Sequence, residues 1–226
     1  MNFRGLINDV LKKYPTLSAE FTESGATLKG QLILNAEYND IPLYDEYYVQ
    51  IEVPKEFPKQ LPNVWELSDS IPRKFQHFLD NGGLCLAASC ELIDYAIDNG
   101  TITGYISKYV MNYLYAASFF SRYGEVPFGE RSHGIKGIKE AYMDRYKCDN
   151  EEILISLLCL LVGIKKYRGH AICPCGSNLK LRDCHGGKVL KDIQSVQYKY
   201  YRHDAYLILH DYVEQKKRNG GAIIYG

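Results

Sequence analysis

Hydrophobic and polar positions along the first part of the chain predict one helix followed by strands. Residues 3–14 place apolar side chains at helical spacing, and Pro15 ends that pattern. Apolar and polar residues then alternate with a period of two in residues 28–34 and again in 47–53, and residues 39–42 supply the turn between them. Consecutive strands with no helix between them predict an antiparallel meander.

The remaining pattern predicts one further strand and then helices. The strand is expected at residues 63–67, and the longest periodic helix at 101–122. Residues 135–146 and 150–164 read as two shorter helices, and 189–218 as one long tyrosine-rich helix. The predicted fold class is therefore α+β, an antiparallel meander with flanking helices, followed by a small helical C-terminal region.

Length and composition set broad limits on domains and partners. A chain of 226 residues suits one domain of about 150 residues and a smaller appendage, and we expect the division at 1–127 and 128–226. Lys and Arg together number 27, as do Asp and Glu, so the net charge of zero gives no electrostatic reason to expect nucleic-acid binding.

The chain shows no targeting or membrane signal. The N-terminus lacks the apolar run of a signal peptide, and the longest apolar run, 153–164, is too short to span a bilayer. We therefore expect a cytoplasmic protein with no membrane partner. Seven cysteines, an odd and clustered set, favour metal or thiol chemistry over disulfides, with the isolated Cys148 and Cys159 as small apolar fillers.

One stretch places a thiol directly after a turn signal. Asn81-Gly82-Gly83 leads straight into Leu84-Cys85-Leu86. Paired glycines allow a tight turn because glycine adopts positive φ without steric cost. We therefore predict Cys85 at the end of a turn, where a macromolecular partner can reach its sulfur. A proline-bearing segment, residues 57–65, precedes this turn and is expected to stay extended.

Residues 20–125 resemble the catalytic half of a ubiquitin-conjugating enzyme. In that family a four-stranded meander leads to a proline segment, a His-containing stretch and Gly-x-x-Cys-Leu, which residues 82–86 match. The resemblance implies that Cys85 carries a thioester to the C-terminus of a partner protein and passes the acyl group to an amine. It also implies that the helix after the cysteine loop lies across the sheet.

The match departs from the eukaryotic pattern ahead of the cysteine. Where that pattern has His-Pro-Asn, this chain has His77-Phe78-Leu79, so the oxyanion-stabilising asparagine is not at its usual place, and Asn81 is a candidate substitute. The departure indicates the bacterial branch, which acts in cyclic-oligonucleotide-based antiphage defence (CBASS). The resemblance thus implies a cGAS-like nucleotidyltransferase as the conjugated partner and a target-protein lysine as acceptor. No glycine-rich nucleotide loop occurs in the sequence, so either a separate activating enzyme exists or the partner arrives activated.

Several side chains near Cys85 have a functional and a structural interpretation. His77 can lower the pKa of the thiol or orient the loop, or be a hydrogen-bonded structural histidine. Asp94 occupies a position where conjugating enzymes often place an acid that deprotonates or orients the incoming lysine, or it lies on a solvated helix face. The solvated face is the simpler interpretation for Glu91. Cys90 is a second acceptor, a redox partner of Cys85, or a small core residue.

The sequence Cys-x-Cys-x8-Cys-His predicts a zinc knuckle. Its ligands are Cys173, Cys175, Cys184 and His185. Three thiolates and an imidazole within so short a segment suit tetrahedral zinc, and a site closed by four protein ligands is structural. A redox pair or unpaired thiols are the alternatives. The Cys-Pro-Cys-Gly-Ser and Cys-His sequences, within residues 170–187, resemble the SEC-C zinc motif.

Three functions follow from these residues. The first is a ubiquitin-conjugating-enzyme-like acyl carrier with Cys85, His77 and Asp94 in the site. The second is a catalytically inactive module of the same fold that binds partners and is stabilised by zinc. The third is a cysteine hydrolase using Cys85 with His77 or His133, which lacks an obvious orienting Asn or Asp.

Overall fold

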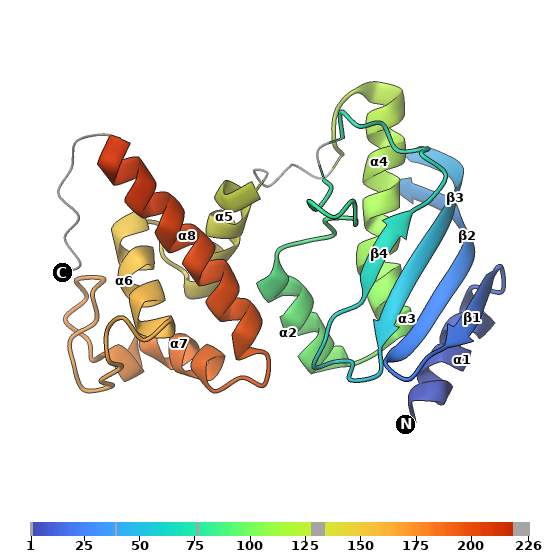
Figure 1. The fold of residues 1–226 in the computed structure, drawn as a ribbon. Helices are drawn as coiled ribbons and strands as arrows, with labels where there is room; N and C mark the ends of the chain where they lie inside the picture. Colours follow the sequence, from blue (N-terminus) through green and yellow to red (C-terminus); the bar gives the residue numbers. More distant parts are fainter. Residues whose placement is uncertain (1, 39, 76, 128–133, 219–226) are drawn as a thin grey trace. The chain divides into compact units, whose positions relative to one another are not determined.

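The computed structural model describes residues 2–38, 40–75, 77–127 and 134–218 (Figure 1). Two compact units divide the chain, Met1–Ala87 with Leu92–Glu130 and Ala88–Glu91 with Arg131–Gly226. The first unit contains the sheet, and the second is helical. His133, named above for the hydrolase hypothesis, lies outside the described residues.

A four-stranded antiparallel sheet in the order β1-β2-β3-β4 forms the centre of the first unit. The strands are β1 (Leu17–Phe21), β2 (Gly25–Tyr38), β3 (Ile41–Pro54) and β4 (Asn63–Glu66). The period-two pattern predicted β2 and β3, which pair with Leu28 opposite Ile51 and Leu32 opposite Tyr47. The prediction of a mixed α+β fold with an antiparallel meander is confirmed.

Helices cover the apolar face of this sheet. Helix α1 (Phe3–Lys13) precedes β1, and α3 (Ile102–Tyr105), the π-helical turn η1 (Ile106–Val110) and α4 (Met111–Tyr123) follow one another as the long helix that the sequence predicted. Helix α4 packs against β2 and β3 (Figure 1). The hydrophobic core lies between them; its largest buried members include Ile7, Leu28, Leu32, Leu34, Ile51, Tyr105 and Ile106.

A polar chain ties α4 to β3 beside this core. Arg122 donates to the Asp45 carboxylate at 2.6 Å, Ser118 donates to the same oxygen at 2.5 Å, and Tyr47 donates to Ser118 at 2.7 Å. The guanidinium and hydroxyl donors hold the pKa of Asp45 below its usual value. The buried Ser118 hydroxyl is thus satisfied on both sides, and α4 is fixed in register against the sheet.

Helix α2 (Ser89–Asn99) was not predicted as an element of its own. It begins four residues after Cys85, and its first residues belong to the second unit while Leu92 onward belongs to the first. Its buried side chains Cys90, Ile93 and Ala96 recur every three residues and so lie on one face of the helix.

The second unit consists of helices around one apolar core. They are α5 (Gly134–Tyr146), α6 (Glu151–Leu161), the short 3-10 turn η2 (Leu181–Asp183), α7 (Gly186–Ile193) and α8 (Tyr198–Arg218). The prediction of a single helix over 189–218 is wrong, because the chain breaks between α7 and α8. At the break, the Ser195 hydroxyl accepts the Gln197 amide at 3.1 Å, and such a local bond competes with helix continuation.

A buried ion pair joins α5 to α7. Arg145 donates twice to Asp192, at 2.7 and 2.8 Å, and the two side chains are 5% and 3% exposed. Tyr146 adds a third bond to the Asp192 carboxylate at 2.9 Å, so the buried charge is paired and hydrogen-bonded. Within the described residues, no helix combines the length and apolar character that crossing a bilayer needs.

Candidate functional site

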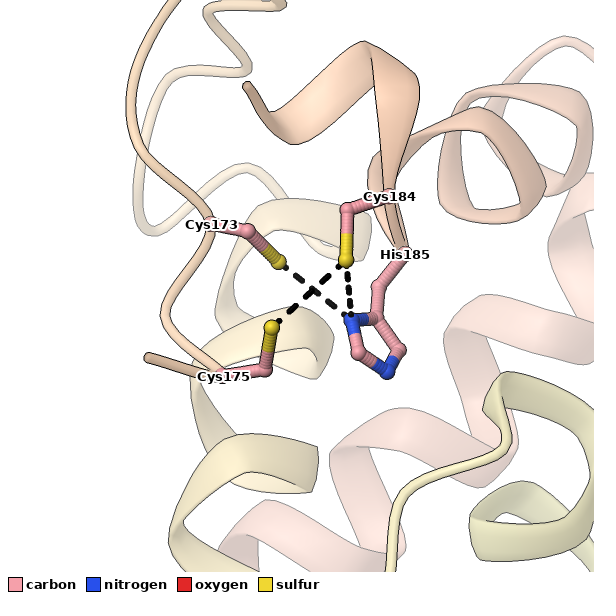
Figure 2. Close-up of side chains that lie close together, drawn as sticks. All are labelled: Cys173, Cys175, Cys184 and His185. Atoms are coloured by element: carbon pink, nitrogen blue, oxygen red, sulfur yellow. Dashed lines mark hydrogen bonds between the residues drawn. The ribbon is translucent and has the colours of Figure 1, made fainter. Parts of the chain in front are cut away.

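Three cysteine sulfurs and one histidine nitrogen converge in the second unit (Figure 2). The ligand atoms of Cys173, Cys175, Cys184 and His185 all lie within 4.8 Å of one another. His185 Nδ1 is 3.1 Å from the Cys184 sulfur and 3.3 Å from the Cys173 sulfur, and the sulfurs of Cys175 and Cys184 are 3.5 Å apart. The four residues predicted as metal ligands are therefore together.

These separations fit tetrahedral coordination of a zinc ion. Zn–S bonds of about 2.3 Å and Zn–N bonds of about 2.0 Å place two sulfurs about 3.8 Å apart and a sulfur about 3.5 Å from a nitrogen. The three separations of 3.1 to 3.5 Å lie close to both values, and the remaining ligand pairs are within 4.8 Å. None of the seven cysteines forms a disulfide in the described structure. The cluster can thus hold a metal such as zinc, and its four protein ligands make it a closed site of the structural kind.

Two short paired segments bring the ligands together. Ile172 and Lys180 form an antiparallel bridge, and the Cys173 amide donates to the Leu179 carbonyl at 2.9 Å. The turn between them passes through Gly176 with φ of 78°, a left-handed conformation that glycine adopts without strain. Cys173 and Cys175 therefore point from one side of this hairpin towards the residues that follow it.

Gly186 permits the close approach that delivers the other two ligands. A Cβ at Gly186 would lie 2.3 Å from Leu181 Cγ and 2.6 Å from the Leu181 carbonyl oxygen. Leu181 is buried and begins η2, so α7 can start directly after Cys184 and His185 only where residue 186 has no side chain. The glycine after the Cys-His pair is therefore a packing requirement of the cluster.

The thiols of the cluster differ in their acidity. The Ser177 hydroxyl lies 3.1 Å from the Cys175 sulfur and is the main cause that lowers the pKa of Cys175 to about 6. Burial raises the pKa of Cys173 to about 11. Cys175 therefore loses its proton more readily than Cys173, and a thiol must lose its proton to bind a metal.

The thiol predicted as the nucleophile, Cys85, closes a small hairpin in the first unit. Phe78 and Leu84 form an antiparallel bridge, and the Cys85 amide donates to the His77 carbonyl at 2.9 Å. The Leu84 amide donates to Val64 of β4 at 2.7 Å, which ties the hairpin to the sheet. Cys85 therefore lies at the end of a tight turn, as the Gly-Gly sequence predicted.

The turn itself is closed by Asn81. The Gly83 amide donates to the Asn81 side-chain oxygen at 3.0 Å, and Gly82 has φ of 78°. This arrangement is the local side-chain bond typical of asparagine in turns. Asn81, the candidate substitute for the oxyanion-stabilising asparagine, thus uses its side-chain oxygen to hold the turn.

Cys85 is half-buried, and burial raises the pKa of its thiol. The pKa of the nearby Tyr113 hydroxyl in α4 is raised as well, first by burial and then by the charge of the Cys85 thiolate. At neutral pH the side chain is a thiol, so its reaction with an electrophile requires loss of a proton.

His77 and Asp94 meet the Cys85 loop in different ways. The His77 carbonyl bonds to the Cys85 amide, and its ring lies 4.7 Å from the Phe75 ring and 6.5 Å from the Tyr113 ring. Asp94 lies half-buried on α2. The backbone contact makes His77 part of the frame of the loop, whereas the roles predicted for its imidazole and for Asp94 stay predictions.

The other cysteines lie in apolar surroundings. Cys90 is 1% exposed and belongs to the second unit. Burial raises the pKa of both Cys148 and Cys159. These environments match the interpretation of the three residues as small core side chains.

Tyr113 is the residue near Cys85 that sequence reasoning missed. Its hydroxyl donates to the His77 carbonyl at 2.9 Å, so this one oxygen accepts from both Tyr113 and Cys85. In the sequence Tyr113 is one of several apolar positions of the long helix, and that periodicity predicts only burial. The contact depends on where the Cys85 loop lies in the folded unit.

Comparison with known protein families finds a match for the metal cluster. No curated protein matches the chain. Residues 171–187, which contain the four ligands, match the family model of the SEC-C motif.

Proposed function

We propose that this chain is a ubiquitin-conjugating-enzyme-like acyl carrier in which Cys85 forms a thioester with the C-terminus of a partner protein. The order of elements supports this: a helix, a four-stranded meander, a cysteine loop between β4 and α2, and then a long helix across the sheet. The observation that carries the proposal is a half-buried thiol fixed at the end of a turn by backbone bonds on both sides. The partner we propose is a cGAS-like nucleotidyltransferase of an antiphage system, reached through the family resemblance.

The chemistry has two acyl transfers. The Cys85 sulfur loses its proton and attacks the activated C-terminal carbonyl of the partner, and the activating group, a nucleotide or another thiol, leaves with the electron pair of the broken bond. A lysine amine of the target then attacks the thioester, an amide forms, and the Cys85 sulfur leaves as thiolate and is reprotonated. A thioester stores the acyl group in a form that amines can attack.

The neighbouring residues have positioning roles in this proposal. His77 frames the loop through its carbonyl, and Asp94 orients the incoming amine from α2. The raised pKa of Cys85 keeps the sulfur protonated until the activated partner is bound, so the thiolate forms where the electrophile is. A separate activating enzyme or a pre-activated partner supplies the energy.

The metal cluster has a stabilising role. A segment as short as 171–187 has little core of its own, so metal binding provides folding free energy. Helix α7, which follows the ligands, is joined to α5 by the ion pair of Asp192 with Arg145. Zinc at this closed site takes no part in the acyl transfer.

The test is incubation of the zinc-loaded chain with the candidate partner and ATP, with and without a candidate activating enzyme. The wild type is expected to form an adduct that dithiothreitol releases, and Cys85→Ala none. Cys159→Ala is the matched control, because it removes a buried thiol from the other unit. Equal adducts from the wild type and Cys85→Ala would overturn the thioester proposal.

One observation favours the second candidate, an inactive module that binds partners. The asparagine of the His-Pro-Asn pattern is absent from its usual place, and the Asn81 oxygen already accepts the Gly83 amide. An inactive binding module keeps its partner interaction in Cys85→Ala and loses it when a chelator removes zinc. An acyl carrier loses adduct formation in Cys85→Ala with zinc still bound.

A further inference from the structure

One carbonyl oxygen near Cys85 accepts two hydrogen bonds from residues far apart in the chain. The His77 carbonyl accepts the Cys85 amide at 2.9 Å and the Tyr113 hydroxyl at 2.9 Å. The first bond closes the hairpin that ends at the thiol, and the second joins that hairpin to α4. The position of this oxygen therefore sets where the Cys85 backbone lies against the helix.

The Tyr113 side chain has little freedom to release this bond. It is 6% exposed, and its ring lies 5.3 Å from the Phe75 ring at 74° and 6.5 Å from the His77 ring at 82°. These edge-to-face contacts fix the ring, so the hydroxyl points at one place. A buried hydroxyl without a partner is unfavourable, which keeps the bond to His77 formed.

The hydroxyl can only donate at this carbonyl, and it keeps its proton. Burial, followed by the charge of the Cys85 thiolate, raises the pKa of Tyr113. A protonated phenol close to the sulfur therefore persists over the pH range in which the thiol titrates.

We propose that Tyr113 is the positioning residue of the thiol site: its hydroxyl fixes the His77 carbonyl, and that carbonyl fixes the amide of Cys85. This role rests on the proposed function, because the position of the Cys85 sulfur matters if it accepts the acyl group of a partner protein. The hydrogen bond that the Leu84 amide donates to the Val64 carbonyl of β4 holds the hairpin on one side, and Tyr113 holds it on the other. Without the hydroxyl, the loop loses this hydrogen bond to α4, and the thiol gains exposure and loses its alignment.

Helix α4 supplies a matched control for the test. Tyr115, two residues on, is also buried and donates its hydroxyl to a backbone carbonyl, that of Ile41 at 3.0 Å. Tyr113→Phe and Tyr115→Phe each delete one such bond and keep the ring. A general effect on stability moves both variants alike, whereas positioning of Cys85 separates them.

The first measurement is the alkylation rate of Cys85 by iodoacetamide in the zinc-loaded full chain, followed by peptide mapping over a pH series. Tyr113→Phe is expected to raise the rate at neutral pH about fivefold, the factor that about 1 kcal/mol for one hydrogen bond gives. The apparent pKa of the thiol is expected to fall towards its ordinary value, because the loosened thiol is better solvated. Tyr115→Phe is expected to match the wild type.

The second measurement is the rate of thioester formation, which is expected to fall about fivefold in Tyr113→Phe only. A loosened thiol is more accessible to iodoacetamide, but it is less well aligned with the carbonyl of the partner protein. Equal alkylation rates in Tyr113→Phe, Tyr115→Phe and the wild type, or equal changes in both variants, would overturn the positioning role. A wild type that forms no thioester would overturn the proposed function instead, and the alkylation rates would still decide whether Tyr113 positions the thiol.

Discussion

Replacing Gly186 by alanine tests how the metal cluster is built. The added Cβ would lie 2.3 Å from Leu181 Cγ and 2.6 Å from the Leu181 carbonyl oxygen. A side chain can rotate away, but the carbonyl belongs to the turn that leads into Cys184, so η2 and α7 have to separate. Such overpacking costs about 1 to 3 kcal/mol.

This cost falls on the metal-bound state, because the ligands Cys184 and His185 lie between Leu181 and Gly186. Converted at 1.4 kcal/mol per factor of ten, zinc affinity is expected to fall about 5-fold to about 100-fold. The neighbouring variant Gly187→Ala is the control. Its Cβ meets its nearest atom, the Arg182 carbonyl oxygen, at 3.4 Å, and its affinity is expected to be unchanged.

The assay is a zinc competition titration with a chromophoric chelator, with thermal unfolding of the zinc-loaded chain measured in parallel. Gly186→Ala is expected to release zinc at lower chelator concentration and to unfold at lower temperature. If Gly186→Ala and Gly187→Ala hold zinc equally, the close approach at Leu181 does not shape the cluster, and the packing argument fails.

Three further predictions concern buried charges and the thiol. Arg145→Ala leaves the Asp192 carboxylate buried and unpaired, so the free energy of unfolding, measured in urea, is expected to fall by about 3 to 5 kcal/mol. Asp204 is 2% exposed, and burial raises its pKa from 3.8 to about 6. Between pH 3.8 and about 6 the folded state therefore keeps a proton that the unfolded state has lost, and the free energy of unfolding falls as pH rises through this range. Asp204→Asn is expected to abolish this pH dependence and to raise the free energy of unfolding at pH 7 by up to about 3 kcal/mol. Alkylation of Cys85 is expected to keep rising with pH beyond the range of an ordinary thiol, because burial raises its pKa; a profile centred at or below the ordinary value would contradict this.

The sequence predicted the features that local pattern determines. Alternation at Leu28, Leu32 and Val49 is enough to predict paired strands, because one face of the sheet is buried. The spacing of Cys173, Cys175, Cys184 and His185 is enough to predict their convergence, because the metal motif is contained in one short segment. The turn before Cys85 was predicted for the same reason.

Features that depend on tertiary contacts were missed. The contact of Tyr113 with His77 joins residues 36 positions apart, and the apolar pattern of the long helix gives no sign of it. The break before α8 depends on the Ser195 side chain capturing a local amide, which outweighs the helical pattern that continues on both sides. Helix α2 is a different case, because its buried positions Cys90, Ile93 and Ala96 do follow a helical spacing, so its own residues carried a signal that was missed.

The measurement that tests the central claim most directly is the intact mass of the chain after reaction with the activated partner, under non-reducing conditions. We predict an adduct equal to the partner mass less one water, mapped to Cys85 and lost on treatment with dithiothreitol, with an adduct resistant to dithiothreitol in Cys85→Ser, where an ester replaces the thioester. An adduct that maps to another residue, or that persists in Cys85→Ala, would contradict the assignment of Cys85 as the acyl carrier.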